Sequence, residues 1–262
     1  MMLHPGGITL TKQVVGYCAF APGAKVLDVG CGTGMTVEYL HTACRLAAVG
    51  VDVSPVRLRQ GRKRAPDLPL IQAAGESLPF ADASFAGVIA ECSLSVMQDA
   101  AAVLVEISRI LVPGGKLAIT DVYLPASTLA AGYMNDKQLK KMLAENGFRI
   151  IIWEDCSAFL REFVAGYIME HGSAAELWPC TIAPKTKVGY FLLVAEKWKA
   201  KGWIALENKI CPRCSKEITD NDPLYQCCRC FSVYCKNCED TNEGRSCPQC
   251  RMGSRLILSA VK

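Results

Sequence analysis

The sequence carries little net charge and lacks any long apolar run. Its 29 Lys and Arg against 25 Asp and Glu leave a formal net charge of +4, too small to indicate a nucleic-acid partner. Basic and aromatic residues are not interleaved, which also argues against nucleic acid. No apolar run approaches the roughly 18 to 20 residues that cross a bilayer, and the first residues lack a signal-peptide pattern. We therefore expect a cytoplasmic protein without a membrane span.

Cysteine is the exception in an otherwise ordinary composition. Hydrophobic residues make up 51% and charged residues 21% of the 262 positions, so the chain can bury one sizeable core and still form a small second unit. Of the 15 cysteines, nine fall between Cys211 and Cys250. In a reducing compartment this density indicates metal binding rather than disulfides.

A strand that ends in a glycine-rich loop is the strongest motif in the first part of the chain. Residues 26–34 read Val-Leu-Asp-Val-Gly-Cys-Gly-Thr-Gly. Glycines in such a loop let the backbone turn sharply and let a ligand approach main-chain N–H groups. The nicotinamide fingerprint G-x-G-x-x-G is not matched, because the third glycine comes one residue early.

A second strand, over residues 47–51, ends in Asp52, whose carboxylate can accept both hydroxyls of a ribose. With acids at Asp28 and Asp52, the glycine loop resembles the first motif of the class I S-adenosylmethionine (SAM) dependent methyltransferases. The resemblance covers about residues 10–198 and implies a SAM cofactor. The cofactor-binding residues that we expect are Asp28, Gly30, Cys31, Gly32, Gly34, Asp52, Val53, Gly75, Glu76 and Glu91.

Residues 73–85, Ala-Ala-Gly-Glu-Ser-Leu-Pro-Phe-Ala-Asp-Ala-Ser-Phe, are similar to a stretch of the quinone-biosynthesis branch of that family. There an acid at the second position usually holds the adenine amino group. This chain has Ala74 at that position. The backbone N–H of Gly75 or the side chain of Glu76 is expected to replace the missing contact.

The order of predicted elements indicates an α/β fold. Helices are expected over residues 8–20, 33–45, 55–65, 99–112, 136–145 and 157–171, and strands over residues 26–29, 47–51, 68–72, 87–90, 116–121, 149–153 and 189–196. Alternation of strands and helices predicts a Rossmann-like, doubly wound, mostly parallel sheet of seven strands whose last strand is antiparallel. Ligand sites are then expected at the carboxyl ends of the strands.

The chain is expected to comprise a methyltransferase domain over residues 1–200, a linker over 201–208 and a cysteine-rich domain over 209–262. The third region contains four Cys-x-x-Cys pairs, and two such pairs close one tetrahedral zinc site. A domain this short needs metal for much of its folding free energy. The eight expected ligands of two structural zinc ions are Cys211, Cys214, Cys227, Cys230, Cys235, Cys238, Cys247 and Cys250.

Two pairings of these ligands remain open. A cross-brace joins the first pair to the third and the second to the fourth, whereas sequential ribbons join the first to the second. Only four residues separate Cys230 from Cys235, which favours the cross-brace. The region is also similar to the cysteine-rich zinc domain of a core subunit of the transcription factor TFIIH. Cys228 could replace a neighbouring ligand, and the domain is expected to hold a protein partner or to cap the methyltransferase domain.

Methyl transfer from a sulfonium is an in-line displacement, so the enzyme mainly aligns the reactants and excludes water. A general base matters only for a protonated acceptor, and the candidates at the strand ends are Glu91, Asp121 and Tyr123, with His4 last. The expected acceptor is a small molecule.

Two alternatives stand beside this interpretation. Arsenite methyltransferases have a similar fold and hold arsenic with thiolates, a role that Cys92, Cys156 and Cys180 could serve here, although small buried apolar residues are the simpler explanation for these cysteines. The chain could instead be a zinc interaction module that senses SAM without turnover.

Overall fold

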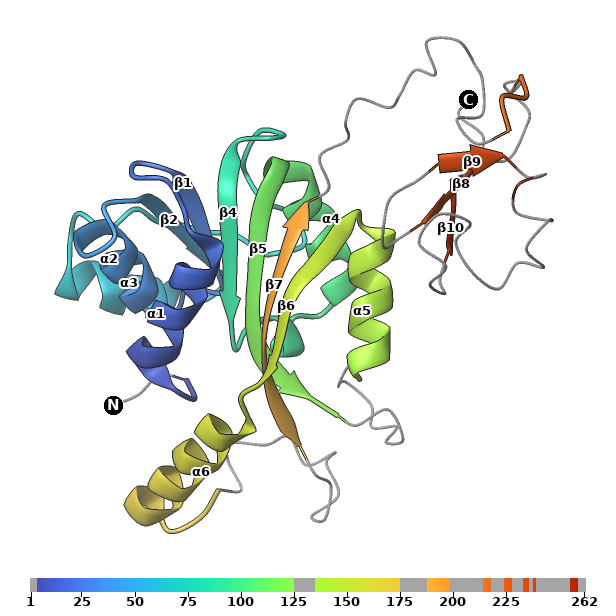
Figure 1. Cartoon of the computed structure of the whole chain (residues 1–262). Helices are drawn as coiled ribbons and strands as arrows, with labels where there is room; N and C mark the ends of the chain where they lie inside the picture. The colour runs from blue at the N-terminus through green and yellow to red at the C-terminus, as the bar shows by residue number, and fades with distance from the viewer. Residues whose placement is uncertain are drawn as a thin grey trace. The chain divides into compact units, whose positions relative to one another are not determined.

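The computed structural model describes residues 4–124, 135–174, 188–197, 214–217, 224–227, 233–235, 238 and 255–258. The chain divides into two compact units, Met1–Trp198 and Lys199–Lys262. Figure 1 labels their helices and strands.

The first unit begins with α1 (Gly7–Cys18), β1 (Lys25–Val29), α2 (Met35–Thr42), β2 (Ala47–Asp52), α3 (Pro55–Arg64), β3 (Leu70–Gln72) and β4 (Phe85–Glu91). It continues with a short 3-10 helix η1 (Leu94–Val96), α4 (Ala100–Ile110), β5 (Leu111–Tyr123), α5 (Asp136–Glu145), β6 (Phe148–Asp155), α6 (Ser157–His171) and β7 (Gly189–Lys197). Strands and helices therefore alternate as the sequence predicted.

The seven strands form one sheet in the order β3-β2-β1-β4-β5-β7-β6. Neighbouring strands from β3 to β5 are parallel, whereas β7 is antiparallel to both β5 and β6. This confirms the predicted Rossmann-like, seven-stranded mixed sheet. The strand order reverses between β1 and β4, and the carboxyl ends of strands beside such a switch point are where ligands bind in open α/β sheets.

Two hydrophobic clusters lie on the two faces of the sheet. Successive residues of a strand point to opposite faces, so Val88 of β4 packs with α4 and α5 while Ile89 packs with α1, α2 and α6. Because β4 is buried on both faces, its sequence reads as a nearly continuous apolar run. Figure 1 shows the later turns of α6 extending beyond the sheet, and of the residues of this helix only Leu160 is buried.

Local sequence signals explain where several helices begin. The Ser54 hydroxyl accepts a hydrogen bond from the N–H of Arg57, and Pro55 occupies the first helical position of α3. Asn135 and Gln138 form a reciprocal capping box at the start of α5. Asp99 caps α4 by accepting from the N–H of Ala102.

The main difference from the predicted elements lies between α4 and β5. The sequence predicts a helix to residue 112 and a strand from residue 116, but α4 ends at Ile110 and β5 starts directly at Leu111. The register along β4 then jumps from Phe85 opposite Leu111 to Gly87 opposite Lys116. Gly114, with a φ of 81°, lets the extra residues bulge without breaking the strand.

The second unit contains a three-stranded antiparallel sheet in the order β10-β8-β9. Its strands are β8 (Leu224–Cys227), β9 (Val233–Cys235) and β10 (Arg255–Leu258). In the described parts of the chain, no helix is both long and apolar enough to cross a membrane.

Candidate cofactor and acceptor site

The glycine loop is held against two neighbouring strands. Its three glycines all have positive φ, at 79°, 55° and 76° for Gly30, Gly32 and Gly34. The N–H groups of Gly30 and Cys31 donate to the carbonyl oxygen of Val51 at 2.8 and 2.9 Å. A side chain at Gly30 would overlap that of Ser93, so both the backbone conformation and the space require glycine there.

Asp52 lies at the end of β2 and faces this loop. Its carboxylate accepts the N–H of Gly32 at one oxygen and the N–H of Ser54 at the other, each at 2.8 Å. A carboxylate oxygen has two lone pairs, so each oxygen can still accept a hydroxyl proton. Val53, the next residue, is 63% exposed beside it. Asp52 is therefore rigidly oriented and keeps capacity for two further donors.

Asp28 occupies an unusual electrostatic position. The residue is 3% exposed and is the last but one of β1, and within the described residues no donor forms a hydrogen bond with its carboxyl group. Burial raises its pKa well above the usual value, and the nearby charges of Glu91 and Asp52 raise it further. Three carboxyl groups thus gather around the glycine loop, an arrangement that favours a ligand carrying positive charge.

Glu91, at the end of β4, joins three segments of the chain. Its carboxylate accepts the Thr11 hydroxyl of α1 at 3.0 Å and the Thr36 hydroxyl of α2 at 2.8 Å. The His4 ring nitrogen Nε2 lies 3.8 Å away, and the Glu91 side chain is only 4% exposed. The first helix is therefore tied to the same strand end that approaches the glycine loop.

Gly75 and Glu76 follow β3 on the other side of the glycine loop. Gly75 is buried, with Met97 and Val103 side-chain atoms 3.1 and 3.2 Å from where a Cβ would lie. The Glu76 carboxylate accepts the N–H of Asp99 at 3.3 Å. This segment is held by the start of α4, and its backbone connects to β2 through the bond from the N–H of Ala73 to the carbonyl of Asp52.

Asp121 and Tyr123 lie on β5, apart from the three-carboxyl group. The Asp121 carboxylate accepts the Ser95 hydroxyl at 2.6 Å and the N–H groups of Ser95 and Val122 at 2.8 Å each. Burial nevertheless raises its pKa. The Tyr123 ring covers Gly189 and packs edge-on against Trp153 and Phe191.

A small pocket opens next to these two residues. It is lined by Leu94, Ser95, Asp121, Val122, Tyr123, Leu139 and Phe191. The lining combines an apolar wall with the Ser95–Asp121 pair. Of the three bases predicted from sequence, Asp121 and Tyr123 share this pocket, whereas Glu91 lies with the cofactor-binding candidates.

The cysteines of the first unit do not form a thiolate site among the described residues. The Cys92 sulfur lies 2.9 Å from the Tyr190 hydroxyl, and burial raises the pKa of the Cys92 thiol. Burial also raises the pKa of Cys156. Both thiols are thereby kept protonated, which does not favour arsenic binding. The third predicted arsenic ligand, Cys180, lies outside the described residues.

The predicted zinc ligands fall mainly where the structure does not describe side chains. Cys214 is exposed, Cys238 is buried, Cys227 ends β8 and Cys235 ends β9. Cys211, Cys230, Cys247 and Cys250 lie outside the described residues. In the part of the chain that is described, no three His, Cys, Asp or Glu side chains come together as a metal site.

Sequence reasoning missed Thr11, Thr36 and Ser95. Thr36 is a polar residue in the first turn after the glycine loop, a position from which a ligand-side role could have been inferred. Thr11 and Ser95 carry no such signal, because their partners Glu91 and Asp121 lie 80 and 26 residues away in sequence.

Comparison with known proteins agrees with this geometry. A family model described as a methyltransferase domain matches residues 27–119. An O-methyltransferase of Pyrenophora dematioidea is 30% identical over 217 residues, covering 72% of this chain and 80% of that protein. A demethylmenaquinone methyltransferase of Corynebacterium urealyticum is 43% identical over 105 residues, covering 40% of this chain and 44% of that protein.

Two solved structures have the same fold. The [4+2]-cyclase SpnF is 27% identical with a TM-score of 0.59, over 72% of this chain and 80% of that chain. Phosphoethanolamine N-methyltransferase 2 of Haemonchus contortus, solved with SAM, is 19% identical with a TM-score of 0.64, over 75% of this chain and 54% of that chain.

The chain therefore belongs to the methyltransferase family defined by this domain. It is a SAM-dependent methyltransferase, and the kinds of relatives it has are consistent with a small-molecule acceptor.

Proposed function

We propose that the protein methylates an oxygen atom of a small, largely apolar acceptor, with SAM held at the carboxyl ends of β1, β2, β3 and β4. The observation that carries this proposal is Asp28, a buried carboxyl group without a donor among the described residues and beside two further acids. A cationic ligand compensates such a group. SAM has both an ammonium and a sulfonium group, so the site fits this cofactor.

Each predicted cofactor residue has a distinct role in this proposal. Asp52 accepts the ribose hydroxyls, and the loop from Gly30 to Gly34 presents backbone N–H groups without obstructing side chains. Asp28 and Glu91 balance the positive charge of the amino-acid part. Gly75 and Glu76 contact the adenine base, while Cys31 and Val53 supply packing. When bound, SAM supplies the methyl group.

Asp121 is the proposed base for the acceptor hydroxyl. It lines the pocket with Ser95, and burial gives its carboxylate a raised pKa, which makes it a stronger base than an exposed acid. The acceptor proton passes to the Ser95 oxygen as the Ser95 proton passes to Asp121. Tyr123 forms part of the wall, and Glu91 serves as a positioning residue because Thr11 and Thr36 already bind its carboxylate.

An oxygen acceptor is proposed because the O-methyltransferase match extends over most of both proteins. The demethylmenaquinone methyltransferase match covers less than half of each chain. It therefore supports the cofactor more than it supports a quinone acceptor, and membership of the quinone-biosynthesis branch is only a proposal.

We further propose that residues 1–200 form the methyltransferase domain, 201–208 the linker and 209–262 a domain with two structural zinc ions. The register of β8 and β9 places Leu224 opposite Cys235, three residues before Cys227. At about 3.3 Å per residue, the Cα atoms of Cys227 and Cys235 are offset by roughly 10 Å along the strands. Two thiolates on one zinc lie only about 3.8 Å apart.

The second and third Cys-x-x-Cys pairs are therefore assigned to different zinc ions. Both the cross-brace and the sequential pairing satisfy this condition, and the short spacing between Cys230 and Cys235 favours the cross-brace. Eight thiolates fill two tetrahedral shells and leave no open position for catalysis. A protein partner for this domain, and a cytoplasmic location that keeps its cysteines reduced, are parts of the same proposal.

Calorimetric titration of SAM and S-adenosylhomocysteine into zinc-replete protein tests the cofactor site. We expect dissociation constants of about micromolar order, and a loss of at least about a hundredfold for Asp52→Ala because two hydroxyl contacts disappear. The exposed acid Asp67, in the loop that precedes β3, provides a control, since Asp67→Ala removes an equal charge away from the carboxyl ends of the strands. Absence of binding by the folded wild-type protein would reject the proposed site.

A further inference from the structure

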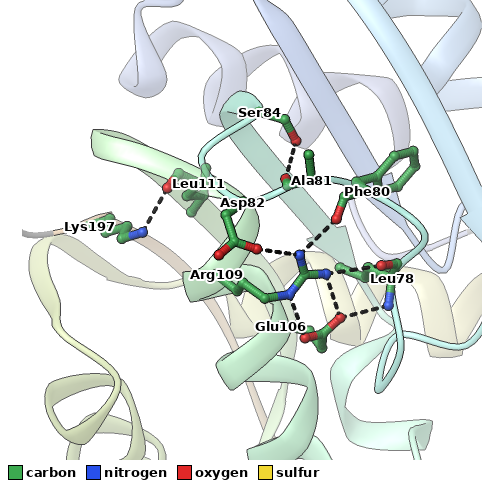
Figure 2. Close-up of polar contacts among 9 residues, drawn as sticks. All are labelled: Leu78, Phe80, Ala81, Asp82, Ser84, Glu106, Arg109, Leu111 and Lys197. Carbon is green, nitrogen blue, oxygen red and sulfur yellow. Dashed lines mark hydrogen bonds and ion pairs between the residues drawn. The ribbon is translucent and has the colours of Figure 1, made fainter.

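A polar cluster joins α4 to the segment between β3 and β4 (Figure 2). The guanidinium group of Arg109 donates to the carbonyl oxygens of Phe80 at 2.7 Å and Leu78 at 3.0 Å. Glu106, one turn earlier on α4, accepts the N–H of Leu78 at 2.8 Å. Two side chains of one helix thus bind three backbone groups of a segment that has no regular secondary structure.

The two side chains also bind each other. Arg109 donates to both carboxylate oxygens of Glu106, through Nε and one terminal nitrogen, each at 2.8 Å. The other terminal nitrogen reaches Asp82 at 2.8 Å. All three guanidinium nitrogens are therefore used in a fixed fork, a geometry that lysine cannot reproduce.

The same segment is fixed to α4 at a second point, nearer the proposed adenine site. Glu76 accepts the N–H of Asp99, the residue that caps α4, and Gly75 packs against Val103 in the first turns of that helix. Only Ser77 separates Glu76 from Leu78. The Arg109–Glu106 contacts therefore begin two residues beyond Glu76, and displacement of Leu78 would move Glu76 with it.

We propose that Glu106 and Arg109 form a brace that fixes Gly75 and Glu76 for recognition of the adenine base, which makes Arg109 a positioning residue for cofactor selectivity. The inference rests on the proposed function, because it takes Gly75 and Glu76 as the base contacts. It adds a role for two residues that touch no part of the cofactor.

The test compares S-adenosylhomocysteine with its deaminated analogue, S-inosylhomocysteine, by calorimetry on the full zinc-replete chain. The two ligands differ only in the base, so a uniform loss of affinity cancels in the ratio of their dissociation constants. We expect the wild-type protein to favour the adenine ligand by about tenfold or more, because the oxo group leaves its polar partners unpaired. In Arg109→Met we expect this ratio to fall to about two.

Asp82→Asn is the matched control, because it removes the charge from one arm of the cluster and leaves the contacts to Leu78 and Phe80 in place. Its ratio should equal that of the wild type. Arg109→Lys keeps the charge without the fork and should also lose selectivity; it replaces the Met variant if that protein does not fold.

An unchanged ratio in a folded Arg109 variant would overturn the brace while leaving the proposed cofactor site intact. Failure of wild-type protein to bind either ligand would instead count against the proposed function itself. Loss of the ratio in Asp82→Asn as well would reject the specific role given to the backbone contacts.

Discussion

At the scale of single residues, Asp28 couples stability to cofactor binding. Burial and the charges of Glu91 and Asp52 raise its pKa above the usual 3.8, so the folded protein keeps a proton that the unfolded chain releases. Stability must therefore fall as the pH rises above that value. We expect Asp28→Asn to melt at a higher temperature than wild type at about pH 8, with the difference vanishing near pH 4.

The same substitution should weaken SAM binding, because an amide, unlike the Asp28 carboxyl group, cannot release a proton and become a charge that faces the ammonium group when SAM binds. Thermal unfolding across this pH range, with calorimetry at neutral pH, measures both effects. A melting-temperature difference that does not change with pH would show that the Asp28 carboxyl group does not cause the loss of stability at higher pH.

At the scale of elements, α1 is fastened to the sheet at two places. Thr11 binds Glu91 at the end of β4, and Gln13 and Tyr17 bind Glu154 of β6 at 2.8 and 2.5 Å. Thr11→Val preserves the shape of the side chain but removes its hydrogen bond. We expect a loss of about 1 kcal/mol in unfolding free energy and faster amide hydrogen exchange in residues 7–18.

Thr42→Val is the control for that experiment, because Thr42 makes its hydrogen bond at the exposed end of α2 to the carbonyl of Glu38. It should leave the exchange of α1 unchanged. If both variants accelerated exchange in α1 equally, the contact with Glu91 would have no specific role in holding this helix.

At the scale of the whole molecule, the two units should respond differently to metal removal. Zinc would supply much of the folding free energy of the second unit, whereas the first has two hydrophobic clusters around its own sheet. We expect two zinc ions per chain by elemental analysis. Chelation should abolish exchange protection in β8, β9 and β10 while SAM affinity changes less than about twofold.

Protease treatment of the chelated protein should then release a fragment ending near the proposed linker, residues 201–208, that still binds SAM. Retention of protected amides in residues 224–227 after complete loss of zinc would contradict a structural role for the metal.

Much of the first unit follows from sequence pattern because its signals are local. Apolar runs indicate strands buried on both faces, and Ser54-Pro55 marks the start of α3 through a cap within three residues. The start of β5 was predicted wrongly because it does not depend on a local signal. Pro113-Gly114-Gly115 usually ends regular structure, but here pairing with β4 continues past a bulge, which depends on a neighbouring strand.

The sequence by itself determined the cofactor family, because the glycine loop and the acids Asp28 and Asp52 are close together in the sequence and form a recognisable motif. Only the tertiary structure decided how deeply those acids are buried and which charges lie beside them. The raised pKa of Asp28 arises first from its burial in the sheet and then from the charges of Glu91 and Asp52, which neighbouring strands bring close to it. Likewise, Arg109 meets Leu78 and Phe80 across about thirty residues of chain. Such pairings depend on distance in space, which no local pattern encodes.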